Sequence, residues 1–141
     1  MNFKRILYLS IIFSSIGCFA LFDNRRVNND FAKLINFLKD VRQSTITDNK
    51  SYIVRFNNKR TDLYTFNNVF VRSLSVPTLS QVNYNTTLGN NMIVFKPGGT
   101  HEHNIQIHGG DIRLKSWLGF SKNIAVNCNG YVSEGVYPED Q

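Results

Sequence analysis

The chain has 141 residues, of which 42% are hydrophobic and 13% aromatic. This length supports one domain with an anchor and excludes two domains of ordinary size. The formal net charge is +6, and without Lys4 and Arg5 the rest of the chain carries +4. A charge of this size is compatible with an anionic partner but is not diagnostic of nucleic acid.

The first predicted element is an apolar run at residues 6–22, which carries no charged side chain. A retained transmembrane helix needs ~20 apolar residues, and this run offers 17. A cleaved secretory signal would use Lys4 and Arg5 as its basic region and end after Ala20, whereas a lipoprotein signal would place Cys18 at the acceptor position. We favour a retained anchor over residues 1–22, because helical periodicity resumes directly after it. The basic pair predicts an N-terminus inside the cell and a domain outside it.

The second predicted element is an amphipathic helix over residues 23–48. Apolar side chains recur there at the spacing of one helix face, namely Phe31, Leu34, Ile35, Leu38 and Val41. We expect this face to pack on a sheet, so that the anchor and the amphipathic helix form one rod. Helical character is lost within residues 44–50, where we expect the helix to end.

Residues 49–141 are predicted to form an antiparallel β domain, because short strand-like runs alternate with turn residues. The expected strands are residues 52–56, 62–66, 69–76, a weaker 81–86, 91–95, 104–108 (stopping at Gly109 and Gly110), 123–127 and 131–133. Residues 111–118 are either a short strand or a connector. The Asn129-Gly130 pair predicts a closing hairpin. The sequence therefore predicts an α+β fold, a long N-terminal helix packed on an antiparallel sheet or sandwich.

Few side chains suggest chemistry. His101 and His103 would share one face of an extended segment, as a metal pair requires, but a polar loop explains them more simply. We therefore expect neither a metal site nor a cofactor. Glycine patterns that cradle phosphate and nucleophile-elbow motifs do not occur, so we expect no enzymatic activity. Cys18 and Cys128 are not expected to pair, because the anchor keeps them apart.

Basic and aromatic side chains lie close together in the sequence at Arg113, Lys115, Trp117 and Lys122. Such a set can bind nucleic acid by neutralising phosphates and stacking on bases. The alternative is a solvated basic surface with Trp117 in the core.

Two blocks of sequence resemble a known family. Residues 31–46, followed by 52–54, are similar to the helix end and first strand of the minor pseudopilins and minor type IV pilins of the GspH/FimT and ComGD kind. Residues 93–99, 105–107, 124–126 and 130–132 are similar to the C-terminal signature of that family. The resemblance implies a pilin-like structural subunit of a type II secretion, type IV pilus or competence assembly.

The same resemblance implies other pilin subunits as partners and a single-pass location in the inner membrane, with the C-terminal domain in the periplasm or outside the cell. Some members of the family bind DNA during uptake, which is an alternative function. The family leader, a Gly followed by Phe-Thr-Leu-x-Glu, does not occur here, and Lys4-Arg5 stands where the apolar helix should begin. We therefore expect either a start upstream of Met1 or a member that no prepilin peptidase processes. An exported β protein with a cleaved signal or a lipid anchor is a further alternative.

Overall fold

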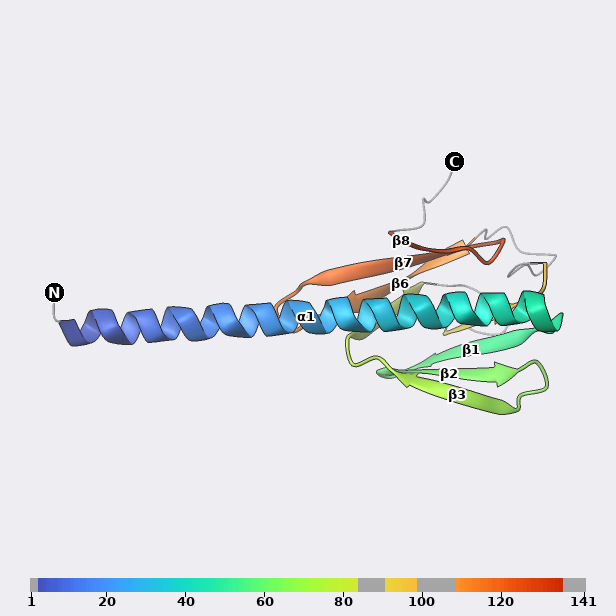
Figure 1. Cartoon of the computed structure of the whole chain (residues 1–141), viewed down its shortest axis with the longest axis horizontal. Coiled ribbons are helices and arrows are strands. Elements are labelled where there is room, and N and C mark those ends of the chain that lie inside the picture. Colours follow the sequence, from blue (N-terminus) through green and yellow to red (C-terminus); the bar gives the residue numbers. More distant parts are fainter. Residues whose placement is uncertain (1–2, 84–90, 99–108, 136–141) are drawn as a thin grey trace.

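The computed structural model describes residues 3–83, 91–98 and 109–135. One long helix, α1 (Phe3–Asp48, 46 residues), lies across two antiparallel sheets of four strands each and extends beyond them at its N-terminal end (Figure 1). The predicted α+β architecture is confirmed, and it is pilin-like.

Helix α1 continues without a break from the apolar run into the amphipathic stripe. At ~1.5 Å per residue it is about 69 Å long. The helix ends at Asp48, and Asn49 after it takes a φ of 50°. Asparagine tolerates this left-handed conformation, which commonly terminates helices. The end falls within residues 44–50, as the sequence indicates.

The first sheet has the strand order β3-β2-β1-β5. Its strands are β1 (Tyr52–Asn57), β2 (Arg60–Thr65), β3 (Phe70–Ser75) and β5 (Met92–Phe95). β1 and β2 form a hairpin, with Asn57 opposite Arg60. β5 pairs with the other edge of β1, so the sequence-distant residues Val54 and Ile93 lie opposite each other.

The second sheet has the order β4-β6-β7-β8. Its strands are β4 (Leu79–Asn83), β6 (Gly109–Lys115), β7 (Ser121–Asn127) and β8 (Val132–Glu134). Gly109 and Gly110 belong to β6, where they pair with Asn127 and Val126, so the prediction that they end a strand is wrong. The expected strand at 104–108 and the end of the one at 81–86 lie outside the described residues.

The closing hairpin is confirmed, because β7 and β8 pair antiparallel. Within its turn only Gly130 has a positive φ, of 77°, and the Asn127 side chain holds the loop by accepting hydrogen bonds from the amides of Asn129 (3.0 Å) and Tyr131 (2.9 Å). A short polar side chain at the end of β7 thus supplies the acceptor that this turn needs.

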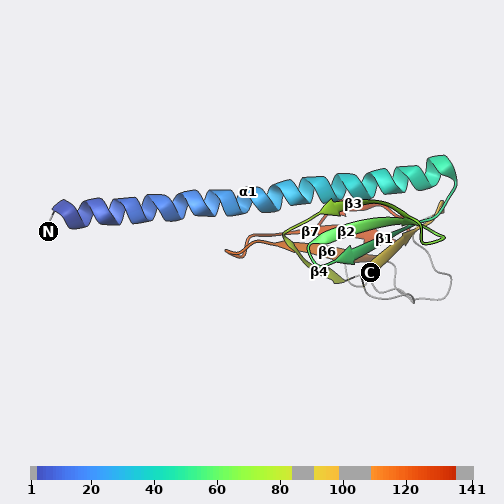
Figure 2. The same cartoon turned by 90° about the horizontal axis from the view of Figure 1, so that it is seen from below.

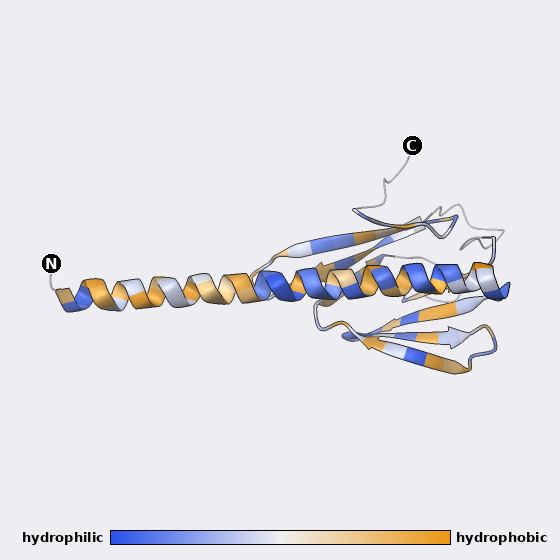
Figure 3. Cartoon of the chain, viewed as in Figure 1, coloured by the Kyte–Doolittle hydropathy of each residue, from blue (hydrophilic) through white to orange (hydrophobic). Residues whose placement is uncertain are grey.

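The hydrophobic core is a single cluster formed by one face of α1 and side chains from both sheets. It includes Val27, Leu34, Leu38 and Val41 from the helix, Val54, Leu63, Ile93 and Phe95 from the first sheet, and Ile112, Leu114, Ile124 and Val126 from the second. Colouring by hydropathy shows the contrast along α1, which is mainly apolar in its projecting part and alternates between apolar and polar residues where it meets the sheets (Figure 3). Figure 2 shows the sheets gathered on one side of the C-terminal half of the helix.

Candidate membrane and assembly interface

The N-terminal part of α1 is not covered by any other part of the chain that the structure describes. We call residues 3–22 the stem and residues 23–48 the docked half. The large apolar side chains of the stem are 45% to 77% exposed. Consecutive apolar residues such as Ile11, Ile12 and Phe13 project on different sides of a helix with 3.6 residues per turn. The 17 uncharged residues 6–22 span about 26 Å of helix, at the short end of what a hydrocarbon core of ~30 Å requires. By length and composition, α1 is apolar enough near its N-terminus to cross a membrane.

Three serines interrupt the stem, and each hydroxyl is satisfied within the helix. Ser10 donates to the carbonyl of Leu7 (2.8 Å), Ser14 to that of Ile11 (2.9 Å) and Ser15 to that of Ile12 (2.8 Å). A hydroxyl bonded to its own helix loses less on leaving water than one without a partner. The serines therefore weaken the apolar character of the stem less than their number in the sequence suggests.

The docked half begins with a buried carboxylate on each of two turns. An Asp23 oxygen accepts a hydrogen bond from the amide of Leu118 in the β6–β7 turn (2.8 Å). An Asp30 oxygen accepts from both the amide (2.9 Å) and the hydroxyl (2.6 Å) of Thr78, which precedes β4. Asp30 lies seven positions after Asp23, so the two aspartates share one helix face with Val27. Sequence reasoning missed them because it followed only apolar residues along the stripe.

Asp23 is held in its ionised form by the loop that it binds. The Ser116 hydroxyl lowers the pKa of the Asp23 carboxyl, and the amides of Leu118 and Trp117 and the charge of Arg26 lower this pKa further, against the opposing effect of burial. A charged acceptor makes a stronger hydrogen bond than a neutral one. This carboxylate therefore fixes the β6–β7 turn to α1 at the residue where the stem ends.

The face predicted to pack on a sheet lies against both sheets. Phe31, Leu34, Leu38 and Val41 are buried, whereas Ile35 is half-buried. Phe37 is also buried, although the predicted stripe omitted it. The guanidinium of Arg72 in β3 lies 4.9 Å from the centre of the Phe37 ring. The docked face is wider than the stripe because the helix contacts two sheets and not one.

The basic and aromatic residues near the β6–β7 turn fall on different faces. Arg113 and Lys115 are exposed on β6, alternating with the buried Ile112 and Leu114. Lys122 pairs with Leu114 and therefore faces inward. Its ammonium lies 4.6 Å from the Phe31 ring centre and 3.5 Å from a Glu134 oxygen. Lys122 thus links α1 to β8, which separates it from the other two cations.

Trp117 is not in the core. It is 87% exposed in the β6–β7 turn, and its neighbours Leu118 and Phe120 are 52% and 40% exposed. The turn itself is ordered by hydrogen bonds, since the amide of Ser116 donates to the Phe120 carbonyl (2.8 Å) and the amide of Phe120 donates to the Ser116 hydroxyl (3.0 Å). A well-ordered turn therefore presents three apolar side chains to the surroundings.

A second exposed apolar surface lies at the β2–β3 connection. Phe66, Val69, Phe70 and Val71 are between 46% and 61% exposed, and β3 is an edge strand of its sheet. The connection lies at the end of the domain that is far from the stem (Figure 1). An exposed apolar edge of this kind is a common feature of contact surfaces between proteins.

The end of α1 is tied to both sheets through Arg42. Its guanidinium donates to the carbonyls of Lys96 (2.8 Å) and Pro97 (3.3 Å), which follow β5. A Cβ atom at Gly130 would lie 2.8 Å from the Arg42 side chain. The two blocks that carry the pilin resemblance therefore meet at this arginine.

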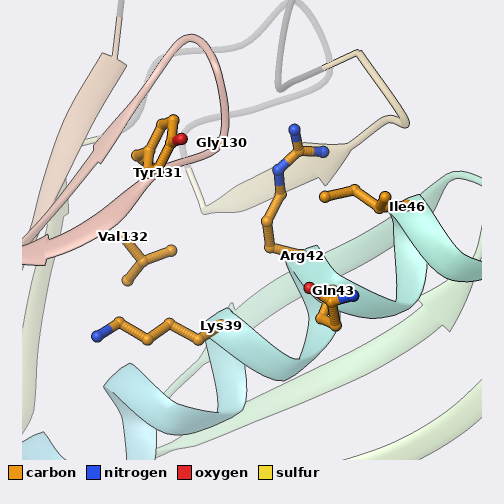
Figure 4. A pocket seen from close by; sticks show the side chains of 7 residues that line it. All are labelled: Lys39, Arg42, Gln43, Ile46, Gly130, Tyr131 and Val132. Atoms are coloured by element: carbon orange, nitrogen blue, oxygen red, sulfur yellow. The ribbon is translucent and has the colours of Figure 1, made fainter.

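An open groove of about 510 Å³ lies beside Arg42, between the end of α1 and the β7–β8 turn. It is lined by Lys39, Arg42, Gln43, Ile46, Gly130, Tyr131 and Val132 (Figure 4).

The remaining candidates concern metals and cysteines. His101 and His103 lie outside the described residues. Within the parts of the chain that the structure describes, no group of three His, Cys, Asp or Glu side chains could hold a metal ion. Cys18 lies exposed on the stem, Cys128 is half-buried in the β7–β8 turn, and no disulfide joins them.

In comparisons with known proteins, no protein-family model, curated protein or solved structure matches the chain. The likeness to pilins therefore rests on the long N-terminal helix and the antiparallel sheets behind it.

Proposed function

We propose that the chain is a minor pseudopilin-like or pilin-like structural subunit of a type II secretion, type IV pilus or competence assembly, and not an enzyme. One observation carries this proposal. A single unbroken helix has an uncovered apolar half and a half that forms the core of a β domain. The stem and the domain are therefore one rigid body, as a subunit needs if it is to be pulled from a membrane and stacked.

The uncovered stem supports a transfer between two apolar surroundings. Apolar side chains cover its whole circumference, so lipid tails can surround it completely. A bundle of neighbouring stems offers an equally apolar environment, and helices in such settings associate through packing and not through a hydrophobic driving force. Moving the stem from lipid into a bundle therefore costs little hydrophobic free energy, while the β domain stays in water.

The proposed location is the inner membrane, with one span and the C-terminal domain in the periplasm or outside the cell. Lys4 and Arg5 support this orientation, since basic residues before a span stay on the cytoplasmic side. The exposed Arg25 and Arg26 follow the span and oppose the rule weakly. Protease added to cells with a permeabilised outer membrane should cleave the β domain, and protection of the domain would contradict the orientation.

The assembly role is tested by cross-linking at the position of Cys18, which is exposed on the stem. In membranes of cells whose chain carries the photoreactive residue p-benzoylphenylalanine in place of Cys18, ultraviolet light should join this position to the stems of other pilins, identified by mass spectrometry. Cys18→Ser is the control for specificity. Adducts that contain no pilin, or no adducts at all, would contradict the proposal.

A matched pair of stem variants sharpens the test. Apart from the helix's own backbone, no described part of the chain lies within 4 Å of a Cβ atom placed at Gly17, so we attribute an effect of Gly17→Leu on assembly to a neighbouring subunit. Gly17→Leu raises the apolar character of the stem and should preserve insertion, yet it should weaken close helix packing. Ile16→Leu changes shape little and should leave cross-linking intact. Charged variants of Leu34 or Leu38 are unsuitable, because both side chains are fully buried in the protein's own core.

DNA binding is the second candidate, and it is favoured by the exposed Arg113 and Lys115 on the outward face of β6. Phosphate contacts make such binding fall steeply with salt. The double variant Arg113→Gln with Lys115→Gln should weaken binding to duplex DNA at low salt, whereas Lys122→Gln should matter less. DNA binding that changes neither with salt concentration nor on neutralising Arg113 and Lys115 would exclude a DNA-binding role for this surface.

A further inference from the structure

We infer that the β6–β7 turn is a second membrane contact, in which Trp117, Leu118 and Phe120 enter the headgroup region of the bilayer that holds the stem. This inference rests on the proposed membrane anchor and adds to it a lipid-binding surface on the β domain. The juxtaposition of an exposed apolar turn with the end of the apolar stem carries it.

The β6–β7 turn lies at the end of the stem. The β6–β7 turn is the part of the β domain that reaches furthest along α1 toward the N-terminus (Figures 1 and 2). The amide of Leu118 donates to the Asp23 carboxylate at 2.8 Å, and Asp23 directly follows Phe22, the last apolar residue of the stem. If the stem fills the hydrocarbon core, the turn lies at the level where hydrocarbon gives way to headgroups.

The polar start of the docked half is about as long as the headgroup layer is thick. The headgroup layer is roughly 5 to 8 Å thick on each side of the hydrocarbon. The four polar residues 23–26 of α1 cover about 6 Å of helix, which matches that layer. Arg25 and Arg26 are exposed there, and Lys115 is exposed at the end of β6. These cations complement anionic lipid headgroups at the same level.

The turn exposes a tryptophan, the kind of side chain that suits a membrane interface. Trp117 is 87% exposed, which is unusual for a large aromatic side chain facing water. Tryptophan is enriched at the membrane interface, where its ring is partly in apolar surroundings and its N–H can bond to headgroups or water. The turn is held rigidly by Asp23 and by its own hydrogen bonds, so lipid contact requires no rearrangement.

A second membrane contact would orient the whole subunit. A single helix leaves the β domain free to rock about the bilayer normal, because tilt is set by interfacial anchors and packing. A second contact beside the helix fixes both the tilt and the rotation of the domain. The surface that the domain offers to neighbouring subunits then has a defined direction before assembly.

The experiment uses Trp117 as its own reporter, because it is the only tryptophan in the chain. The full chain is reconstituted into vesicles of phosphatidylcholine and phosphatidylglycerol that carry bromine on shallow or deep acyl carbons. We expect shallow bromine to quench Trp117 more than deep bromine does. We also expect acrylamide to quench it at least about twofold less than a tryptophan at a water-facing site.

The matched control moves the reporter to the far end of the domain. In Trp117→Phe with Tyr131→Trp, the tryptophan replaces a side chain that is 73% exposed in the β7–β8 turn. That reporter should be quenched by acrylamide and not by bromolipid. Flotation of the vesicles after an alkaline wash reports separately on the stem, so failure of the anchor is distinguished from failure of the turn contact.

Three results would overturn the inference in chains that float. The first is bromolipid quenching of Trp117 no greater than that of the Tyr131→Trp reporter. The second is acrylamide protection that rises with the protein-to-lipid ratio without bromolipid quenching, which would assign the turn to a second copy. The third is a change in Trp117 emission on addition of DNA but not of lipid.

Discussion

The two halves of α1 belong to one helix and yet meet different surroundings. In the docked half, Val27, Leu34, Leu38 and Val41 are at most 1% exposed, and the core of the protein's own β domain covers them. In the stem, similar side chains such as Leu9 and Ile12 are about half exposed, whichever side of the helix they lie on. The docked half is amphipathic because one face has a partner within the chain. In the stem no side of the helix is covered by the described residues, and in the proposed function lipid or neighbouring stems surround it.

The difference teaches where the protein's own stability ends. Burial against two sheets stabilises the docked half, and loss of a core side chain there must destabilise the β domain. In the proposed function the stem serves insertion or assembly, and changes in it should be neutral for the stability of the β domain. The two aspartates at the boundary mark the change, since each ties a loop of the β domain to the helix.

The largest expected effect compares one leucine from each half. Leu38→Ala removes a fully buried side chain from the core and should lower the free energy of unfolding of the β domain by about 2–5 kcal/mol. Leu9→Ala should change it by less than about 0.5 kcal/mol. Urea unfolding in detergent micelles, followed by circular dichroism, measures both. Equal losses in the two variants would show that the halves are not energetically distinct.

The reverse comparison concerns insertion. Phe13→Arg places a charge near the centre of the stem and should cost about 3 kcal/mol of insertion free energy. Asn36→Arg, on the exposed face of the docked half, should leave insertion unchanged. The fraction of protein resistant to alkaline extraction measures the effect. A Phe13→Arg protein that stays fully inserted would contradict a membrane-spanning stem.

A smaller effect is expected at the far end of the docked half. Gly130→Ala should cost about 1–2 kcal/mol, because alanine is strained at positive φ. The added Cβ would also lie 2.8 Å from the Arg42 side chain. Gly98→Ala is the control, since among the described residues nothing beyond its chain neighbours lies within 4 Å of a Cβ atom there. Denaturant midpoints of the two variants decide the matter, and a Gly130→Ala protein as stable as Gly98→Ala would refute the close contact with Arg42.

The smallest effect concerns pH at the boundary. The pKa of Asp23 is lowered below its usual 3.8, so this carboxylate stabilises the fold above that pH. As the pH falls below 3.8 through the lowered pKa, protonation should release the β6–β7 turn and change the emission of Trp117. Asp23→Asn should abolish this transition, whereas Asp48→Asn should keep it. Fluorescence titration in micelles checks it, and an identical transition in Asp23→Asn would rule Asp23 out as its cause.

Much of the fold follows from local patterns. Helical spacing from Phe31 to Val41 predicted a docked helix, and the Asn129-Gly130 pair predicted the hairpin of β7 and β8. The alternation of residues along β7 was also present in the sequence, but the predicted strand began only at Asn123 and so left out Lys122. Lys122, Ile124 and Val126 alternate along β7, so a strand that begins at Ser121 places Lys122 on the inward face. The grouping of Lys122 with Arg113 and Lys115 depended on sequence proximity, which ignores the two faces of a strand.

The sequence alone determined that the chain carries a membrane-length apolar helix, an amphipathic continuation and a run of antiparallel strands, because these features depend on periods of two and 3.6 residues. Only the tertiary structure decided that the strands divide into two sheets, that Asp23 and Asp30 hold two loops to the helix, and that Trp117 lies beside the end of the stem. Those facts depend on contacts between residues up to 95 positions apart, which no local pattern encodes.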